Sequence, residues 1–151
     1  MKVIFAAALI ATLPMCAQAA LPITHYAAAA PNGLGPMPGG APYSAAVMAG
    51  DTLYVAGTTD GGATGMPAQD ARAAAKIVLD HIKGTVEKAG LTMDDLVWVQ
   101  VFASDLKDYA AFNEVYRTYF TGPMPARAFI GAGSLLGGAH FEAMGVAVRK
   151  K

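Results

Sequence analysis

Few residues of this chain have the types and spacing that metal binding or nucleophilic catalysis requires. The sequence holds three histidines and one cysteine, and His25, His81 and His140 lack the spacing of a zinc site. The stretch 57–65 is rich in glycine but lacks the lysine and the serine or threonine of a phosphate-binding loop. His140 and Glu142, two residues apart on a predicted strand, share a face and could form a proton relay, although such pairs are often structural. We therefore predict no metal site.

Arg127 offers a different chemistry, the recognition of a small carboxylate. Its planar guanidinium can donate two parallel hydrogen bonds to a carboxylate, a geometry that lysine cannot match. In a cleft its charge also favours anionic ligands. The alternative is a solvated arginine at the start of a strand, paired with an acidic side chain. The residue type alone leaves both interpretations open.

Composition limits the classes of partner. The chain has 151 residues and a formal net charge of zero. It therefore lacks the basic excess that phosphate contacts require, and we predict no nucleic-acid partner. Hydrophobic residues make up 54% and charged residues 15%. Such a chain exposes apolar surface that a small monomer cannot easily hide, so we expect self-association.

The first nineteen residues, 1–19, have the pattern of an export signal. Lys2 is followed by an apolar run at 3–13 and by the small-x-small cleavage motif Ala17-Gln18-Ala19. The run is too short to span a bilayer, and no second one follows, so we expect a periplasmic or secreted mature chain without a membrane partner. Cys16 would be removed with the signal. The alternative is a lipid anchor at Cys16, although Met15 is bulkier than lipoprotein signals favour at that position.

The mature chain begins with a segment that we predict to be irregular, at 20–41, because it is rich in alanine, proline and glycine. A hairpin is expected from 44–48 and 52–56 around Gly50-Asp51, followed by a loop at 57–67. Apolar residues at helical spacing predict helices at 68–89 and 106–120. Strands are expected at 96–102, 126–132 and 140–148.

This order of elements predicts one sheet with two helices on one face. Two helices cannot cover both faces of such a sheet. The other face must then be hidden by closure of a barrel or by partner subunits.

Several segments together resemble the Rid (YjgF) family, in its order and at nearly its spacing, over Ala41 to Lys150. The resemblance implies a Rid-like domain at 42–151 with an α+β, chorismate-mutase-like fold, one mixed sheet and two helices on one face. It also implies a homotrimer with ligand clefts between subunits and no metal or organic cofactor. In its best-known branch, water attacks a 2-aminoacrylate-type enamine or imine to give ammonia and a 2-keto acid. The segments are Pro42-Tyr43-Ser44, Leu53-Tyr54-Val55-Ala56-Gly57, Ala89-Gly90-Leu91-Thr92-Met93-Asp94-Asp95, Val101-Phe102 with Asp105, Phe112-Asn113-Glu114-Val115-Tyr116, Tyr119-Phe120 and Pro125-Ala126-Arg127.

The resemblance also assigns roles to individual residues. Arg127 becomes the carboxylate anchor of the site. Tyr43 either contributes a phenol to the cleft rim or simply packs at a strand start. Gly57 either lets backbone N–H groups approach the ligand or ends a strand. Asn113, on the second helix, is expected to order a loop or the ligand.

The chain departs from the family pattern at the reacting centre. Related deaminases commonly have a glutamate where this chain has Met144, two residues after Glu142, and that carboxylate positions the attacking water. A thioether is a poor acceptor and cannot take up a proton. Phe129 stands where cysteine is frequent and makes the pocket more apolar or fills it. Thr58, in Ala56-Gly57-Thr58, replaces the glutamine of the more usual Ser-Gly-Gln.

Three functions follow from this pattern. The first is an exported enamine/imine deaminase, a hydrolase that binds its substrate through Arg127 and activates water without Met144. The second is a non-catalytic protein whose cleft holds a small carboxylate, such as a keto acid, or an aromatic acid. The third is a chaperone-like trimer that meets other proteins through its apolar surface. Ribonuclease activity, attributed to some relatives, is the least favoured because the chain is neutral.

Overall fold

The computed structural model describes residues 20–28, 40–61 and 66–150. The predicted export signal at 1–19, including Cys16, lies outside the described residues, as does 29–39 of the segment predicted to be irregular. Within the described part of the chain, no helix is both long and apolar enough to cross a membrane.

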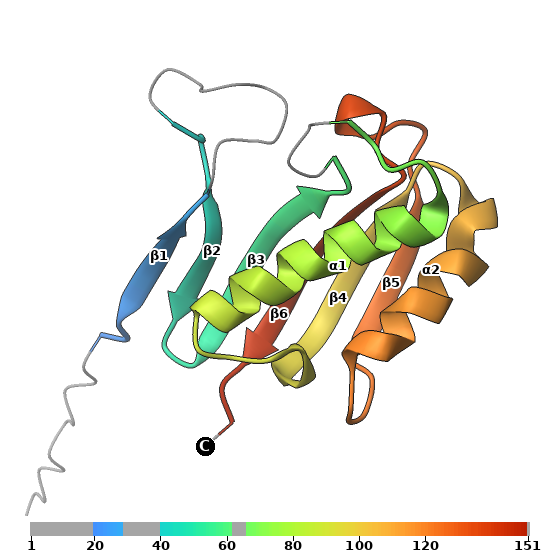
Figure 1. Cartoon of the computed structure of the whole chain (residues 1–151). Helices are drawn as coiled ribbons and strands as arrows, with labels where there is room; N and C mark the ends of the chain where they lie inside the picture. The colour runs from blue at the N-terminus through green and yellow to red at the C-terminus, as the bar shows by residue number, and fades with distance from the viewer. Residues whose placement is uncertain (1–19, 29–39, 62–65, 151) are drawn as a thin grey trace, which may run out of the picture.

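Six strands form one sheet in the order β1-β2-β3-β6-β4-β5. Neighbouring strands are antiparallel except β4 and β5, which are parallel. The two helices, α1 (Ala71–Lys88) and α2 (Tyr109–Tyr116), both lie on the same face of this sheet (Figure 1). The predicted α+β fold, a mixed sheet with two helices on one face, is therefore confirmed. The strands are β1 (Ile23–Ala27), β2 (Ser44–Ala49), β3 (Thr52–Thr59), β4 (Leu96–Ala103), β5 (Ala126–Gly131) and β6 (Phe141–Val148).

The prediction of an irregular segment at 20–41 is wrong for β1. This strand pairs antiparallel with β2, with Tyr26 opposite Ala46. Most of its side chains are exposed, and Tyr26 is the one that packs against the core. The segment therefore lacks the buried alternation by which a strand is identified from sequence. It forms a strand because the edge of β2 offers free backbone hydrogen-bonding groups.

The loop predicted at 57–67 begins later than expected, because β3 continues to Thr59. The pairing of β3 with β6 shifts register between Val55 and Thr58, and this irregularity carries the strand past Gly57. A Cβ atom on Gly57 would collide with Oε1 of Glu142 on β6. Glycine at this position therefore makes room for the Glu142 carboxylate beside β3.

The helix predicted at 68–89 is observed as α1. Asp70 Oδ1 accepts hydrogen bonds from the backbone N–H groups of Arg72 and Ala73, both 2.9 Å long, and so caps the start of the helix. Just past its end, Gly90 has a φ of +74°, the left-handed conformation in which glycine carries no steric penalty. One stripe of the helix is buried against the sheet: Ala74, Ala75, Val78, Leu79, Ile82 and Val86.

The helix predicted at 106–120 is a short α-helix between two 3-10 turns. The turn η2 (Leu106–Asp108) precedes α2, and η3 (Arg117–Tyr119) follows it. Phe112 and Tyr116 are the buried residues of α2, and their rings stack with centroids 5.7 Å apart. The short helix therefore presents a row of aromatic rings to the sheet.

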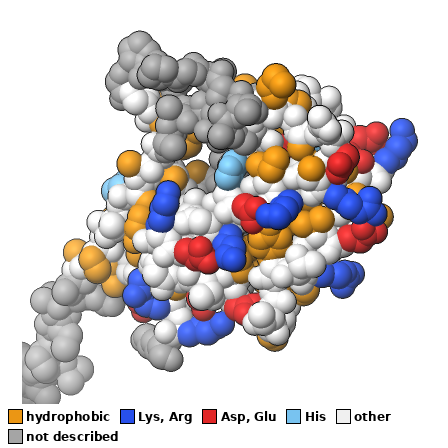
Figure 2. Space-filling model, viewed as in Figure 1, with side chains coloured by type: hydrophobic (Ala, Val, Ile, Leu, Met, Phe, Trp, Pro, Cys, Tyr) orange, Lys and Arg blue, Asp and Glu red, His pale blue; other side chains and the backbone are white. Residues whose placement is uncertain are grey.

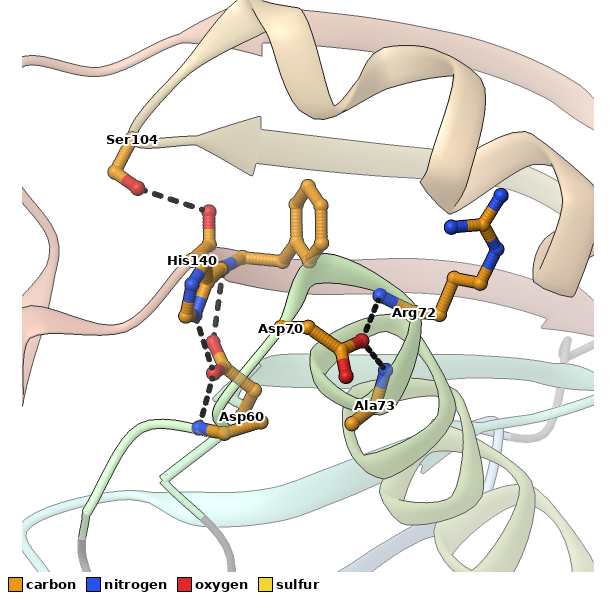
Figure 3. Close-up of polar contacts among 8 residues, drawn as sticks. Asp60, Asp70, Arg72, Ala73, Ser104 and His140 are labelled. Carbon is orange, nitrogen blue, oxygen red and sulfur yellow. Dashed lines mark hydrogen bonds and ion pairs between the residues drawn. The ribbon is translucent and has the colours of Figure 1, made fainter.

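Asp60, directly after β3, is the one charged side chain that is completely buried among the described residues. Its Oδ1 accepts the N–H of Phe141 at 2.9 Å, and its Oδ2 accepts the N–H of Ala68 at 3.2 Å. The ring of His140 points at the same carboxylate, with Nδ1 3.3 Å from Oδ2 (Figure 3). No hydrogen bond among the described residues joins His140 to Glu142, which agrees with the structural interpretation of this pair and not with a proton relay.

We expect Asp60→Asn to lower the free energy of unfolding by about 2–4 kcal/mol, because the amide would turn a donor toward one of the two N–H groups. Chemical denaturation followed by circular dichroism measures this loss. Asp51→Asn, in the β2–β3 turn, is the matched control and should change stability by less than about 0.5 kcal/mol. Equal losses of unfolding free energy in the two variants would show that the Asp60 carboxylate does not stabilise the contact between the end of β3 and the start of β6.

Candidate functional site

Arg127 projects toward α2 from the edge of the sheet. It is the second residue of β5 and lies opposite Val99 of β4. Val99 is buried in the core, and residues opposite each other on neighbouring strands share a face. The Arg127 side chain therefore lies between β5 and α2.

Four aromatic rings surround the guanidinium of Arg127. Its central carbon lies 4.5 Å from the ring centroid of Tyr116, 5.7 Å from that of Phe112 and 5.8 Å from that of Tyr109. The fourth ring, Phe129, lies at 5.6 Å and packs edge-on against Phe112. Ring faces attract a cation, and their apolar surroundings strengthen its field. Phe129, predicted to make the pocket more apolar, is thus one wall of this aromatic cage.

One end of the guanidinium is held by an amide, and the other end has no partner. Nη2 of Arg127 donates to Oδ1 of Asn113 at 2.6 Å, so Asn113 orders the arginine. Nη1 is buried and has no hydrogen-bond acceptor among the described residues, and the same holds for the hydroxyl of Tyr116. Arg127 takes part in none of the ion pairs among the described residues. A buried charge without a partner is costly, which favours a ligand or another subunit as the missing acceptor.

Tyr116 is suited to donate its hydroxyl proton. Burial raises the pKa of its phenol to about 12, although the guanidinium of Arg127 acts in the opposite direction. The hydroxyl therefore stays protonated at any physiological pH. Two buried donors, Arg127 Nη1 and Tyr116 Oη, consequently lack acceptors in the same aromatic cage.

A crevice of about 250 Å³ between the end of α2 and the start of β5 is lined by the two residues that carry these donors. Drug-sized ligands usually occupy roughly 300–1,000 Å³, so this crevice fits a smaller molecule. Among the described residues, its walls carry two arginines and no carboxylate. The lining residues are Asn113, Tyr116, Arg117, Met124, Pro125 and Arg127.

Gly57 and Met144 lie on the other face of the sheet. On β6 the side chains of Ala143 and Ala147 are fully buried beneath the helices, so Glu142 and Met144 project to the opposite face. A Cβ atom on Gly57 would meet both Glu142 and the Met144 methyl group, which places Gly57 beside them. Within one protomer these residues and Arg127 therefore belong to two separate groups.

Two other predicted site residues lie outside the crevice. Thr58 faces α1, where its hydroxyl lies 3.2 Å from Nδ1 of His81. Tyr43 precedes β2 and is half exposed. The structure therefore brings together Arg127, Asn113 and Phe129.

Sequence reasoning missed Tyr116 and Arg117 as residues of the crevice. Both follow Asn113 at the spacing of one helical turn, three and four residues later. That spacing could have placed them beside the amide. The sequence gives no sign, however, that the Tyr116 hydroxyl lacks a partner.

Comparison with known proteins identifies relatives over most of the chain. The family described as Endoribonuclease L-PSP matches residues 37–149. The structure of the YjgF gene product from E. coli is 32% identical, with a TM-score of 0.72, over 84% of this chain and 100% of that one. RidA from an Antarctic Psychrobacter is 32% identical, with a TM-score of 0.69, over 80% and 94% of the two chains.

A third structure contains a small ligand. E. coli TdcF with bound serine is 29% identical, with a TM-score of 0.70, over 81% of this chain and 94% of that one. The family match and these neighbours confirm the predicted resemblance. The chain therefore belongs to the Endoribonuclease L-PSP family, the family of the RidA and YjgF proteins.

Proposed function

We propose that this protein hydrolyses small enamines or imines derived from 2-amino acids, releasing a 2-keto acid and ammonia. The observation that carries the proposal is the buried Nη1 of Arg127, which lacks an acceptor beside an equally unpartnered Tyr116 hydroxyl. A carboxylate would satisfy both donors, and charge-assisted hydrogen bonds of this kind are the strong ones. Binding of serine, itself a small carboxylate, by the relative TdcF supports the same ligand class.

In this proposal Arg127 holds the substrate by its carboxylate. An enamine first becomes the imine by gaining a proton at its β-carbon and losing one from nitrogen, and water then attacks the C=N carbon. The water oxygen forms the new C–O bond, the C–N bond breaks, and the protons of water leave with nitrogen as ammonia. The nearby guanidinium withdraws electron density through the bound carboxylate and holds the carbon in place. Positioning and preorganised charge would supply the rate enhancement.

We further propose that the site is completed between protomers of a homotrimer. Arg127 faces α2, whereas Gly57 and Met144 lie on the face that neither helix covers, so they can meet only if a second copy brings its open face to the crevice. That face exposes Tyr54, Ile130 and Val148, an apolar surface suited to such an interface. Sedimentation velocity at micromolar concentration should detect a trimer, and a monomer would contradict the composite site.

This chemistry needs a base that accepts a proton from the attacking water. Met144 cannot take up a proton. Glu142 projects to the same face, and its carboxylate lies beside Gly57 together with the Met144 methyl group. We propose Glu142 or the substrate's own carboxylate as the proton acceptor. Met144 also favours a second candidate function, in which the protein binds a small carboxylate without turning it over.

The ribonuclease function in the family's name has less support. On the helix side of the molecule, lysine and arginine side chains are interspersed with aspartate and glutamate (Figure 2). A nucleic-acid interface usually shows a basic stripe.

We also propose that the protein acts after export, on the strength of the apolar run at 3–13 and the Ala17-Gln18-Ala19 motif.

We expect Arg127→Ala to weaken the binding of pyruvate about 10- to 100-fold and to lower kcat/KM for 2-aminoacrylate generated in situ by a similar factor. Arg127→Lys should recover little, because lysine lacks the planar fork. Calorimetry and keto-acid release measure the two quantities. Arg149→Ala, an arginine outside the crevice, is the control. Unchanged binding in Arg127→Ala would remove the carboxylate site and the proposal with it.

We expect Met144→Glu to raise kcat/KM by about 10²-fold or more, because it supplies a positioned carboxylate. Met144→Gln, which is polar but cannot act as a base, should not. The same enamine assay measures both variants. If neither the parent nor Met144→Glu exceeds the rate in buffer while pyruvate still binds, the protein is a carboxylate-binding protein and not a hydrolase.

A further inference from the structure

The crevice beside Arg127 has a second cation in its wall. Arg117 is the first residue of η3, directly after α2, and its side chain lines the crevice together with Arg127. Arg117 is exposed, and no ion pair or hydrogen bond among the described residues includes its side chain. Because Arg117 is exposed and Arg127 is half buried, Arg117 lies nearer the mouth of the crevice.

The acidic residue of α2 that could neutralise Arg117 is engaged elsewhere. Glu114, three residues before it, accepts from the guanidinium of Arg72 on α1 at 2.6 Å and 2.7 Å. In the part of the chain that the structure describes, no aspartate or glutamate lines the crevice. Two guanidinium groups therefore share a small space without a carboxylate, and like charges so placed favour a ligand that neutralises both.

The inner wall of the crevice can satisfy one carboxylate on its own. Tyr116 is only 4% exposed, and its hydroxyl and Nη1 of Arg127 are both without acceptors. A carboxylate that reached these two donors would satisfy both, so they would account for one anionic group of a ligand. Arg117, at the mouth, is not needed to bind that group. Its charge therefore favours a ligand with a second anionic group further along the molecule.

We propose that the crevice selects dicarboxylates, that is, 2-keto or 2-imino acids with a second carboxylate on the side chain, and that Arg117 is the residue that determines this preference. The inference rests on the proposed function for the role of Arg127, and it adds the class of substrate. The first carboxylate binds Arg127 and Tyr116, and the second binds Arg117.

A matched pair of ligands tests the preference. 2-Oxoglutarate and 2-oxopentanoate have the same five-carbon chain, and they differ only in the terminal carboxylate or methyl group. Calorimetry on the full-length mature protein should give a dissociation constant about five- to tenfold lower for 2-oxoglutarate, since Arg117 is exposed and its charge is partly screened. The preference should shrink as salt is raised.

Three variants separate this inference from the proposed function. Arg117→Gln should bring the ratio of the two dissociation constants close to one, because it weakens 2-oxoglutarate more than 2-oxopentanoate. Lys88→Gln removes the same charge from the end of α1 that points away from α2 (Figure 1) and should keep the preference. Tyr116→Phe should weaken both ligands alike, because the hydroxyl serves the carboxylate they share.

The outcomes are distinct. Equal affinities in the parent protein, or a preference that survives Arg117→Gln, overturn the dicarboxylate inference. Either result leaves the proposed function standing as long as Arg127→Ala weakens both ligands. If neither ligand binds the parent protein, both proposals are overturned.

Discussion

The proposed site depends on one half-buried guanidinium, Arg127, for which the described residues supply no counter-ion. Arg127 is enclosed by four aromatic rings, receives a single hydrogen bond acceptor from Asn113, and keeps Nη1 unpartnered. A charge in such surroundings is costly unless an acceptor arrives from outside the protomer. The aromatic side chains of α2 and the neutral amide of Asn113 leave the charge of Arg127 unneutralised, which is consistent with an anion-binding site.

The topology explains why Arg127 lies apart from Gly57 and Met144 within one protomer. The parallel pairing of β4 and β5 requires a connection that crosses over the sheet, and α2 is that connection. The crossover sets α2 over β5 and turns Arg127 toward the helix. The antiparallel strands β3 and β6 send Gly57 and Met144 to the opposite face. The two groups of residues therefore lie on opposite sides of one sheet, and the proposed trimer would bring them together.

Periodic patterns were enough to predict both helices, five of the six strands and the single covered face. They missed β1, because its side chains are mostly exposed and its stability comes from backbone pairing with β2. The predicted end of β3 is also too early, because the register shift between Val55 and Thr58 is not visible in the alternation of side chains. The family pattern singled out Arg127 and Asn113, which the structure places in contact with each other. The lack of a partner for the Tyr116 hydroxyl was not predicted, because it depends on packing between distant elements.

The most direct test of the central claim is a crystal structure of the mature protein with and without pyruvate. The account predicts that the pyruvate carboxylate accepts hydrogen bonds from Arg127 Nη1 and Tyr116 Oη, in a crevice closed by the open face of a second copy. It would be contradicted if Nη1 of Arg127 were paired with a carboxylate or carbonyl of a neighbouring subunit in both crystals. The buried guanidinium would then hold the oligomer together, and no ligand would be needed to explain it.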